Sequence, residues 1–110
     1  MDREFKEIIV FMIIMLEAGM KKVVVTVIGE DRVGIVAGVS GELAKENVNI
    51  MDISQTILDD IFHMVLVCDM ENAADSLQKI QEVMAALGEK LGVDIRVQLA
   101  DIFYAMHRIK

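Results

Sequence analysis

The sequence predicts an α+β fold in which a four-stranded antiparallel sheet carries two helices on one face. Four segments are rich in β-branched residues or alternate apolar with polar side chains, which is typical of strands. Two other segments repeat apolar residues every three or four positions, which indicates helices. Their order is βαββαβ, the ferredoxin-like arrangement. A short C-terminal helix and a candidate N-terminal helix are expected in addition.

Composition sets the class of protein. The chain has 110 residues and a formal net charge of −7, a length that fits one domain with a single modest core. Its hydrophobic fraction of 55% excludes disorder. Cys68 is the single cysteine, which excludes an internal disulfide and fits a reducing cytoplasm. The acidic balance argues against nucleic acid and against an anionic membrane surface, because both carry negative charge.

The first strand and the first helix follow from local composition. Lys22–Ile28 (KVVVTVI) predicts a strand because it is dominated by β-branched residues. Ile35–Glu46 predicts a helix, and Asn47 is expected to stop it. Gly38 and Gly41 each lower helix propensity by about 1 kcal/mol relative to Ala. We therefore expect both glycines to allow a close approach of the helix to the sheet.

A β-hairpin is expected next. Val48–Leu58 and Ile61–Asp69 read as strands, and Asp59-Asp60 forms a tight turn between them. Both faces of the second of these strands are apolar, although only one face can meet the helices. The other face then needs a partner or a second copy of the chain. The two sets of side chains are Ile61, Val65 and Val67 on one face, and Phe62, Met64 and Leu66 on the other.

The C-terminal part contains the clearest helical pattern. Ala73–Leu91 repeats apolar residues at helical spacing, and Gly92 is expected to end that helix. Val93–Ala100 alternates apolar and polar residues, as a half-buried strand does. Asp101 can then cap a short final helix, Ile102–Arg108.

Residues 1–19 form an N-terminal apolar extension, and residues 20–110 form the single domain. The apolar run Ile8–Leu16 is too short to span a bilayer, which takes about 20 residues. The start is net acidic and lacks a small-residue cleavage site, which argues against a signal peptide. Either this extension is a helix between Asp2 and Gly19 that needs burial, or the natural protein begins at Met20. An intact mass from the native source distinguishes the two.

The sequence gives little support for catalysis or metal binding. Cys68 lies in an apolar strand, where a thiol is commonly buried and inert. His63 and His107 read as structural, and no cluster of metal ligands stands out. RNA binding needs exposed aromatic side chains on the sheet, and Phe62 alone falls on a candidate strand. We therefore expect a protein that is not an enzyme and has no metal and no cofactor.

The loop GEDRVG before the first helix carries the clearest binding chemistry. A helix start offers unpaired N–H groups and a positive dipole end, which bind a carboxylate. Gly34 lets the backbone approach a ligand, and Asp31 can accept from an ammonium group or simply cap the helix. Asn49 supplies donors and an acceptor. This inventory matches an amino acid, and an ordinary capped helix start is the competing interpretation.

The same residues resemble a known family. The pattern G-x-D-x-x-G-I before the first helix (Gly29, Asp31, Gly34, Ile35) and NVNIMDI at the second strand resemble an ACT domain. The ending DIFYAMHRI resembles that of small stand-alone ACT-domain proteins. The resemblance runs from about Met20 to Lys110 and extends to the ACT domains of the glycine cleavage system repressor.

The resemblance implies a ferredoxin-like fold, a homodimer, and a small amino acid bound at a domain interface to regulate an enzyme or another regulator. Many members have Pro where this chain has Val33, and some have His where it has Gly29, so the polar contacts can differ. One copy and no DNA-binding element are present, so DNA binding does not follow. The ligand-binding residues carried over are Asp31, Arg32, Val33, Gly34, Ile35 and Asn49.

Two functions fit the sequence. The first is a non-catalytic amino-acid-binding module that acts as a homodimer in the cytoplasm. The second is an interaction or assembly module with no small ligand, supported by the apolar second face of strand Ile61–Asp69.

Overall fold

A computed structural model of the chain describes residues 4–10 and 22–106. The elements that follow residue 21 have the predicted order, and most boundaries fall within two residues of expectation. They are β1 (Lys22–Glu30), α2 (Ile35–Lys45), β2 (Asn49–Leu58), β3 (Ile61–Asp69), α3 (Leu77–Leu91), β4 (Val93–Leu99) and α4 (Ala100–Met106).

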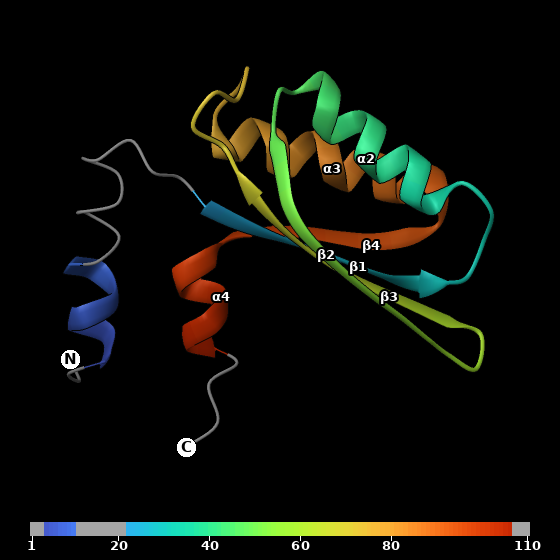
Figure 1. The fold of residues 1–110 in the computed structure, drawn as a ribbon, viewed down its shortest axis with the longest axis horizontal. Helices are drawn as coiled ribbons and strands as arrows, with labels where there is room; N and C mark the ends of the chain where they lie inside the picture. Colours follow the sequence, from blue (N-terminus) through green and yellow to red (C-terminus); the bar gives the residue numbers. More distant parts are fainter. Residues whose placement is uncertain (1–3, 11–21, 107–110) are drawn as a thin grey trace.

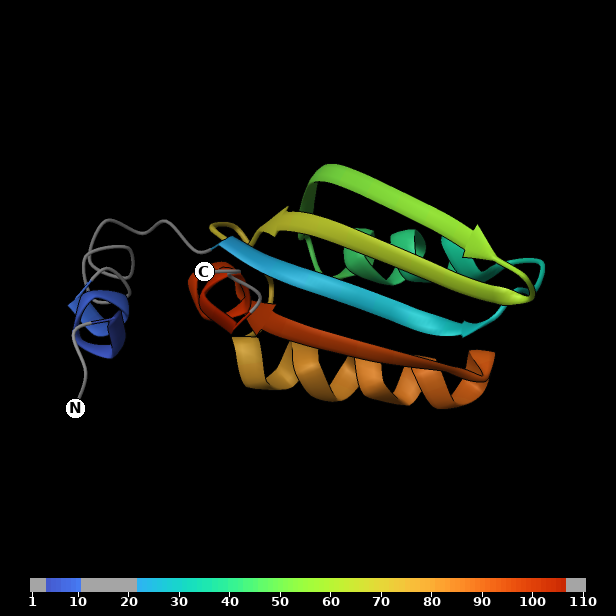
Figure 2. The ribbon, with the colours of Figure 1, turned by 90° about the horizontal axis from the view of Figure 1, so that it is seen from below.

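The four strands form one antiparallel sheet in the order β2-β3-β1-β4. Helices α2 and α3 cover one face of it, while α4 lies on the opposite face at the end where β1 begins (Figures 1 and 2). The ferredoxin-like βαββαβ fold with an added C-terminal helix is therefore confirmed.

The core lies between the sheet and the two covering helices. The alternation of strand side chains decides which residues enter it. The sequence predicted two apolar faces for β3, and the structure shows which one meets the helices: Phe62, Met64 and Leu66 are buried under them. Val24 in β1 points away from this core but is buried, on the side where α4 packs against β1. The second face is thus covered at one end.

Helix α3 starts later than the sequence predicted. We expected it from Ala73, but it begins at Leu77, because Ser76 caps it. The Ser76 hydroxyl accepts a hydrogen bond from the Lys79 amide at 3.2 Å. Its end was predicted correctly, since Gly92 adopts a left-handed conformation with φ 77°.

The helices near the two ends of the chain are described only over part of their predicted ranges, and α4 starts earlier than the sequence predicted. Helix α4 begins at Ala100, directly after β4, so Asp101 lies inside its first turn and is not its cap. His107 and Arg108 fall outside the described residues. Residues 4–10 are helical, and the rest of the predicted N-terminal extension lies outside the described residues.

The expectation for the two helical glycines is corrected. A Cβ on Gly38 would lie 3.1 Å from Leu91 of α3, so the close approach is between two helices and not to the sheet. A Cβ on Gly41 would meet nothing within 4 Å. Gly41 is therefore not required by packing, and it lowers the stability of α2 without a compensating contact.

Strand β2 is an exposed edge. Every residue from Met51 to Leu58 is solvent-exposed, and Asp52 is the one charged side chain in the strand. Its outer rim faces no other described strand, as Figure 2 shows for the strand at the top of the sheet. Such an edge offers unpaired backbone groups to another strand. No helix among the described residues is long and apolar enough to cross a membrane.

Candidate functional site

The loop between β1 and α2 is anchored to the β2–β3 hairpin. The Asp31 amide donates to the Asp60 carbonyl at 2.9 Å, which fixes the loop beside the hairpin turn. Gly34 has φ 95°, a conformation that side chains other than glycine rarely adopt. Its carbonyl accepts from the Gly38 amide at 2.8 Å, so the helix starts immediately after it.

The N-terminus of α2 is open. Gly34 is the N-cap, and no side chain caps this end, so the alternative in which Asp31 caps the helix does not hold for the described residues. The first-turn amides, which start at Ile35, therefore have no partner within the helix and no capping oxygen. Val33 projects fully into solvent beside them. An anionic group can reach this end of the helix without displacing a side chain.

The Arg32 side chain points toward the turn between α3 and β4. Its guanidinium lies 3.4 Å from a Glu30 carboxylate oxygen, and it also covers Gly92, where a Cβ would lie 3.4 Å from Arg32 Nη1. Gly92 ends α3, so this cation lies at the negative end of the α3 dipole. Within one chain, Arg32 thus stabilises the α3–β4 turn.

The predicted residues do not converge within one chain. Asn49 opens β2, whereas the loop Asp31–Ile35 lies beside the end of β2. The ten-residue strand between them is about 30 Å long. The structure therefore brings Asp31, Val33, Gly34 and Ile35 together at one end of the sheet and places Asn49 at the other.

Asn49 lines a cavity of about 370 Å³ at its own end of the sheet. The cavity lies where α2 ends, β2 begins and β3 ends. Sequence reasoning identified Asn49 but missed Asn47, Asp69 and Asn72. The available signals were that Asn47 is two residues from Asn49 and that Asp69 directly precedes a loop. Its lining residues are Ala44, Asn47, Val48, Asn49, Asp69 and Asn72.

The walls of this cavity are held by short hydrogen bonds. Asn47, in a left-handed conformation with φ 57°, donates from Nδ2 to the Asn72 carbonyl at 2.6 Å. The Ala74 amide donates to the Glu46 carbonyl at 2.8 Å, which joins the same two loops a second time. Asp69 Oδ1 accepts from the Glu71 amide at 2.8 Å. The cavity is therefore built from a fixed backbone.

A second hollow, of about 280 Å³, lies on the sheet face opposite α2 and α3. It is mostly apolar, and its Ile28, Leu58 and Ile61 side chains are exposed. Thr56 and His63 complete its lining. This hollow is the feature that an assembly function would use.

The described residues offer little to catalysis. They contain no group of three or more His, Cys, Asp or Glu side chains that could hold a metal ion. Burial raises the pKa of the Cys68 thiol to about 11, so the thiolate that would act as a nucleophile is rare at neutral pH.

Two carboxyl groups meet beside the cavity. Glu46 Oε2 is closed off from solvent and has no hydrogen-bond partner among the described residues while it is ionised. A hydrogen bond to the Asp75 carboxyl, which needs a proton on one of the two groups, raises the pKa of Glu46 above its ordinary 4.5, and burial adds to this rise. The folded state therefore holds this proton more tightly than the unfolded state does.

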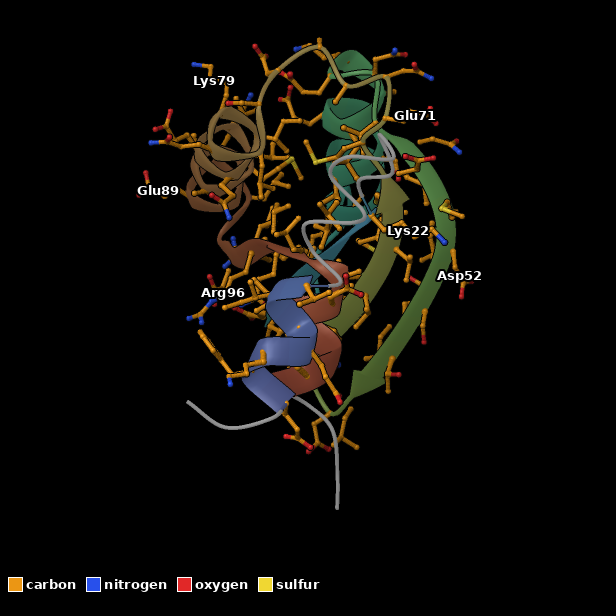
Figure 3. All side chains as sticks on the ribbon, turned by 90° about the vertical axis from the view of Figure 1, so that its left-hand side faces the viewer. Lys22, Asp52, Glu71, Lys79, Glu89 and Arg96 are labelled. Carbon is orange, nitrogen blue, oxygen red and sulfur yellow. The ribbon has the colours of Figure 1, made fainter. Side chains whose placement is uncertain are left out.

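The Glu46→Gln variant is expected to be more stable than the wild type at pH 7. Because the pKa of Glu46 is raised in the folded state, protonated Glu46 contributes stability at pH values below 4.5, and this stability is lost as the pH rises through the folded-state pKa. A glutamine side chain stays neutral at every pH, so the variant keeps this stability at pH 7. Melting temperatures measured between pH 4 and pH 8 check this. Glu89→Gln is the control, because Glu89 points outward from α3 (Figure 3). An equal gain in both variants would contradict the role of the Glu46–Asp75 pair.

The chain is similar in sequence and in fold to known proteins of one family. A family model described as an ACT domain matches residues 21–98. A UPF0237 protein of Methanopyrus kandleri is 53% identical over 90 residues, which are 82% of this chain and 100% of that protein. An ACT domain protein from Streptococcus pneumoniae is 40% identical with a TM-score of 0.67, over 83% of this chain and 98% of that chain. These matches confirm the resemblance seen in the sequence.

A structure described as a glycine cleavage system transcriptional repressor shares the fold. It superposes with a TM-score of 0.61 at 18% identity, over 72% of this chain and 45% of that chain.

Proposed function

Because this chain belongs to the ACT domain family, we propose that it is a non-catalytic regulatory protein that binds a small amino acid as a homodimer. The ligand lies between two copies of the chain, and the liganded state is read by an enzyme or another regulator. The protein works in the cytoplasm, where its single free cysteine, Cys68, stays reduced.

The open N-terminus of α2 carries this proposal. Gly34 leaves the first-turn amides of the helix without a side-chain cap, and these amides suit a carboxylate. The exposed loop around Val33 leaves the approach free, and the Asp31–Asp60 hydrogen bond holds the loop in place. An amino acid supplies the carboxylate that this helix end lacks.

A dimer explains why the predicted residues lie apart. If the β2 edges of two copies pair in antiparallel fashion about a two-fold axis, residue 49 of one copy lies opposite residue 58 of the other. Asn49 from one chain then lies beside the Asp31–Ile35 loop of its partner. The seam holds two equivalent sites, and neither is complete in a monomer.

Assembly without a ligand is the second candidate function. The apolar hollow around Ile28, Leu58 and Ile61 favours it, because side chains of this type tend to be covered in a complex. In this alternative the sheet face opposite α2 and α3 binds another protein, and the cavity near Asn49 stays empty.

A thermal-shift screen of the twenty amino acids at millimolar concentration tests the proposed function. Binding to the folded state alone stabilises it by about 2.7 kcal/mol at a hundredfold excess over Kd, so the melting temperature should rise by about 10 °C or more. We expect Asn49→Ala to abolish this rise and Ser54→Ala, on the same strand, to retain it. A flat response across the panel would favour assembly alone.

A further inference from the structure

We propose that Asp69 is a specificity-determining residue that binds the ammonium group of the ligand inside the 370 Å³ cavity. This inference rests on the proposed function and adds to it the orientation of the ligand. It starts from the chemistry of the cavity and not from the loop at the other end of the sheet.

The cavity favours a group that donates hydrogen bonds and carries positive charge. Of its six described lining residues, three are asparagines, one is Asp69, and none is basic. The cavity also adjoins the C-terminal end of α2, where the helix dipole is negative. A carboxylate is therefore disfavoured here, whereas an ammonium group is stabilised.

Asp69 is held ready for such a contact. Its Oδ1 accepts from the Glu71 amide at 2.8 Å, which fixes the carboxylate at the end of β3. No described side chain forms an ion pair with it within 4.0 Å, although Lys22 is its cross-strand neighbour in β1. Asn49 is its neighbour in β2 and lines the same cavity. The second carboxylate oxygen is thus free for a ligand.

The two ends of α2 then bind opposite ends of a zwitterion. The helix is about 16 Å long, so one small amino acid cannot reach both ends within a chain. Antiparallel pairing of β2 edges brings the open N-terminus of one α2 toward the cavity of the partner. The carboxylate lies on one copy and the ammonium group lies on Asp69 of the other.

Matched probes test this orientation. Isothermal titration compares glycine, L-alanine and L-serine with glycolate, L-lactate and L-glycerate, in which a hydroxyl replaces the ammonium group. Wild type is expected to prefer the amino acid by about tenfold or more, because a charge-assisted hydrogen bond is lost in the hydroxy acid. Asp69→Asn keeps the acceptor for the Glu71 amide but is expected to lose this preference.

Asp94→Asn is the matched control, because it removes the same charge far from the cavity. Asp94 pairs with Arg96 at 3.1 Å on edge strand β4, and Figure 3 shows Arg96 on the side of the sheet opposite Asp52 of β2. This control should keep the wild-type preference. Equal preferences in wild type and Asp69→Asn would overturn the inference while the proposed function stands. Absence of binding by every one of the twenty amino acids to the wild type would overturn both.

Discussion

Replacing Ile53 and Ile57 together with lysine is expected to convert the proposed homodimer into a monomer. Both side chains are exposed on edge strand β2, at 42% and 57%, so the single chain should still fold. In an antiparallel β2 seam, however, four lysines would lie along the two paired strands, two from each copy, and charge on an edge strand opposes strand pairing. We expect dimerisation to weaken by about 3 kcal/mol or more, which is over a hundredfold. Analytical ultracentrifugation across a dilution series measures this change.

The control for this prediction separates the two candidate interfaces. Ile28 and Ile61 are comparably exposed, at 46% and 56%, but they lie on the sheet face opposite the helices. Lysine at these two positions should leave an edge-paired dimer intact. A dimer that survives Ile53→Lys with Ile57→Lys but dissociates with Ile28→Lys and Ile61→Lys would contradict the edge seam and favour pairing through the sheet face.

Gly88→Ala is expected to destabilise the domain by about 1–3 kcal/mol. A Cβ on Gly88 would lie 2.6 Å from the Val93 carbonyl oxygen and 3.3 Å from Ile95 Cγ1, so α3 would have to move away from β4. That cost exceeds the gain in helix propensity, because the contact is with backbone that cannot rotate away. Urea denaturation followed by circular dichroism measures the loss.

Gly41→Ala tests the same reasoning with the opposite sign. This glycine also lies inside a helix, yet a Cβ there meets nothing within 4 Å. The substitution should therefore stabilise the domain by about 0.5–1 kcal/mol. If both alanine variants were stabilised, the close approach of α3 to β4 would not be what Gly88 serves.

Most of the fold could be predicted because local patterns and packing agree. Strand β3 has the predicted bounds, since its alternate side chains fill the core under α2 and α3. The predicted start of α3 was wrong because apolar residues occur from Ala73 onward, whereas the helix begins only after Ser76, whose side chain caps it. Gly41 was misjudged because the apolar pattern of α2 does not show which of its two glycines lies at a contact with another helix.

The candidate site could be predicted only in part. The loop around Gly34 was found because its left-handed conformation and helix start depend on adjacent residues. The cavity was missed because Asn47 and Asp69 come together only when α2, β2 and β3 are assembled. The direction of Arg32, toward Gly92, likewise depends on a contact across the fold.

The exposed edge of β2 also bears on how the protein behaves at high concentration. Asp52 is the one charged residue in its ten, so little protects the strand against pairing in the wrong register or with a foreign chain. In the proposed dimer, pairing of the β2 edges and aggregation compete for the same backbone groups. The chain is therefore most prone to fibril-like stacking just after synthesis, before the edge of β2 has paired with a second copy.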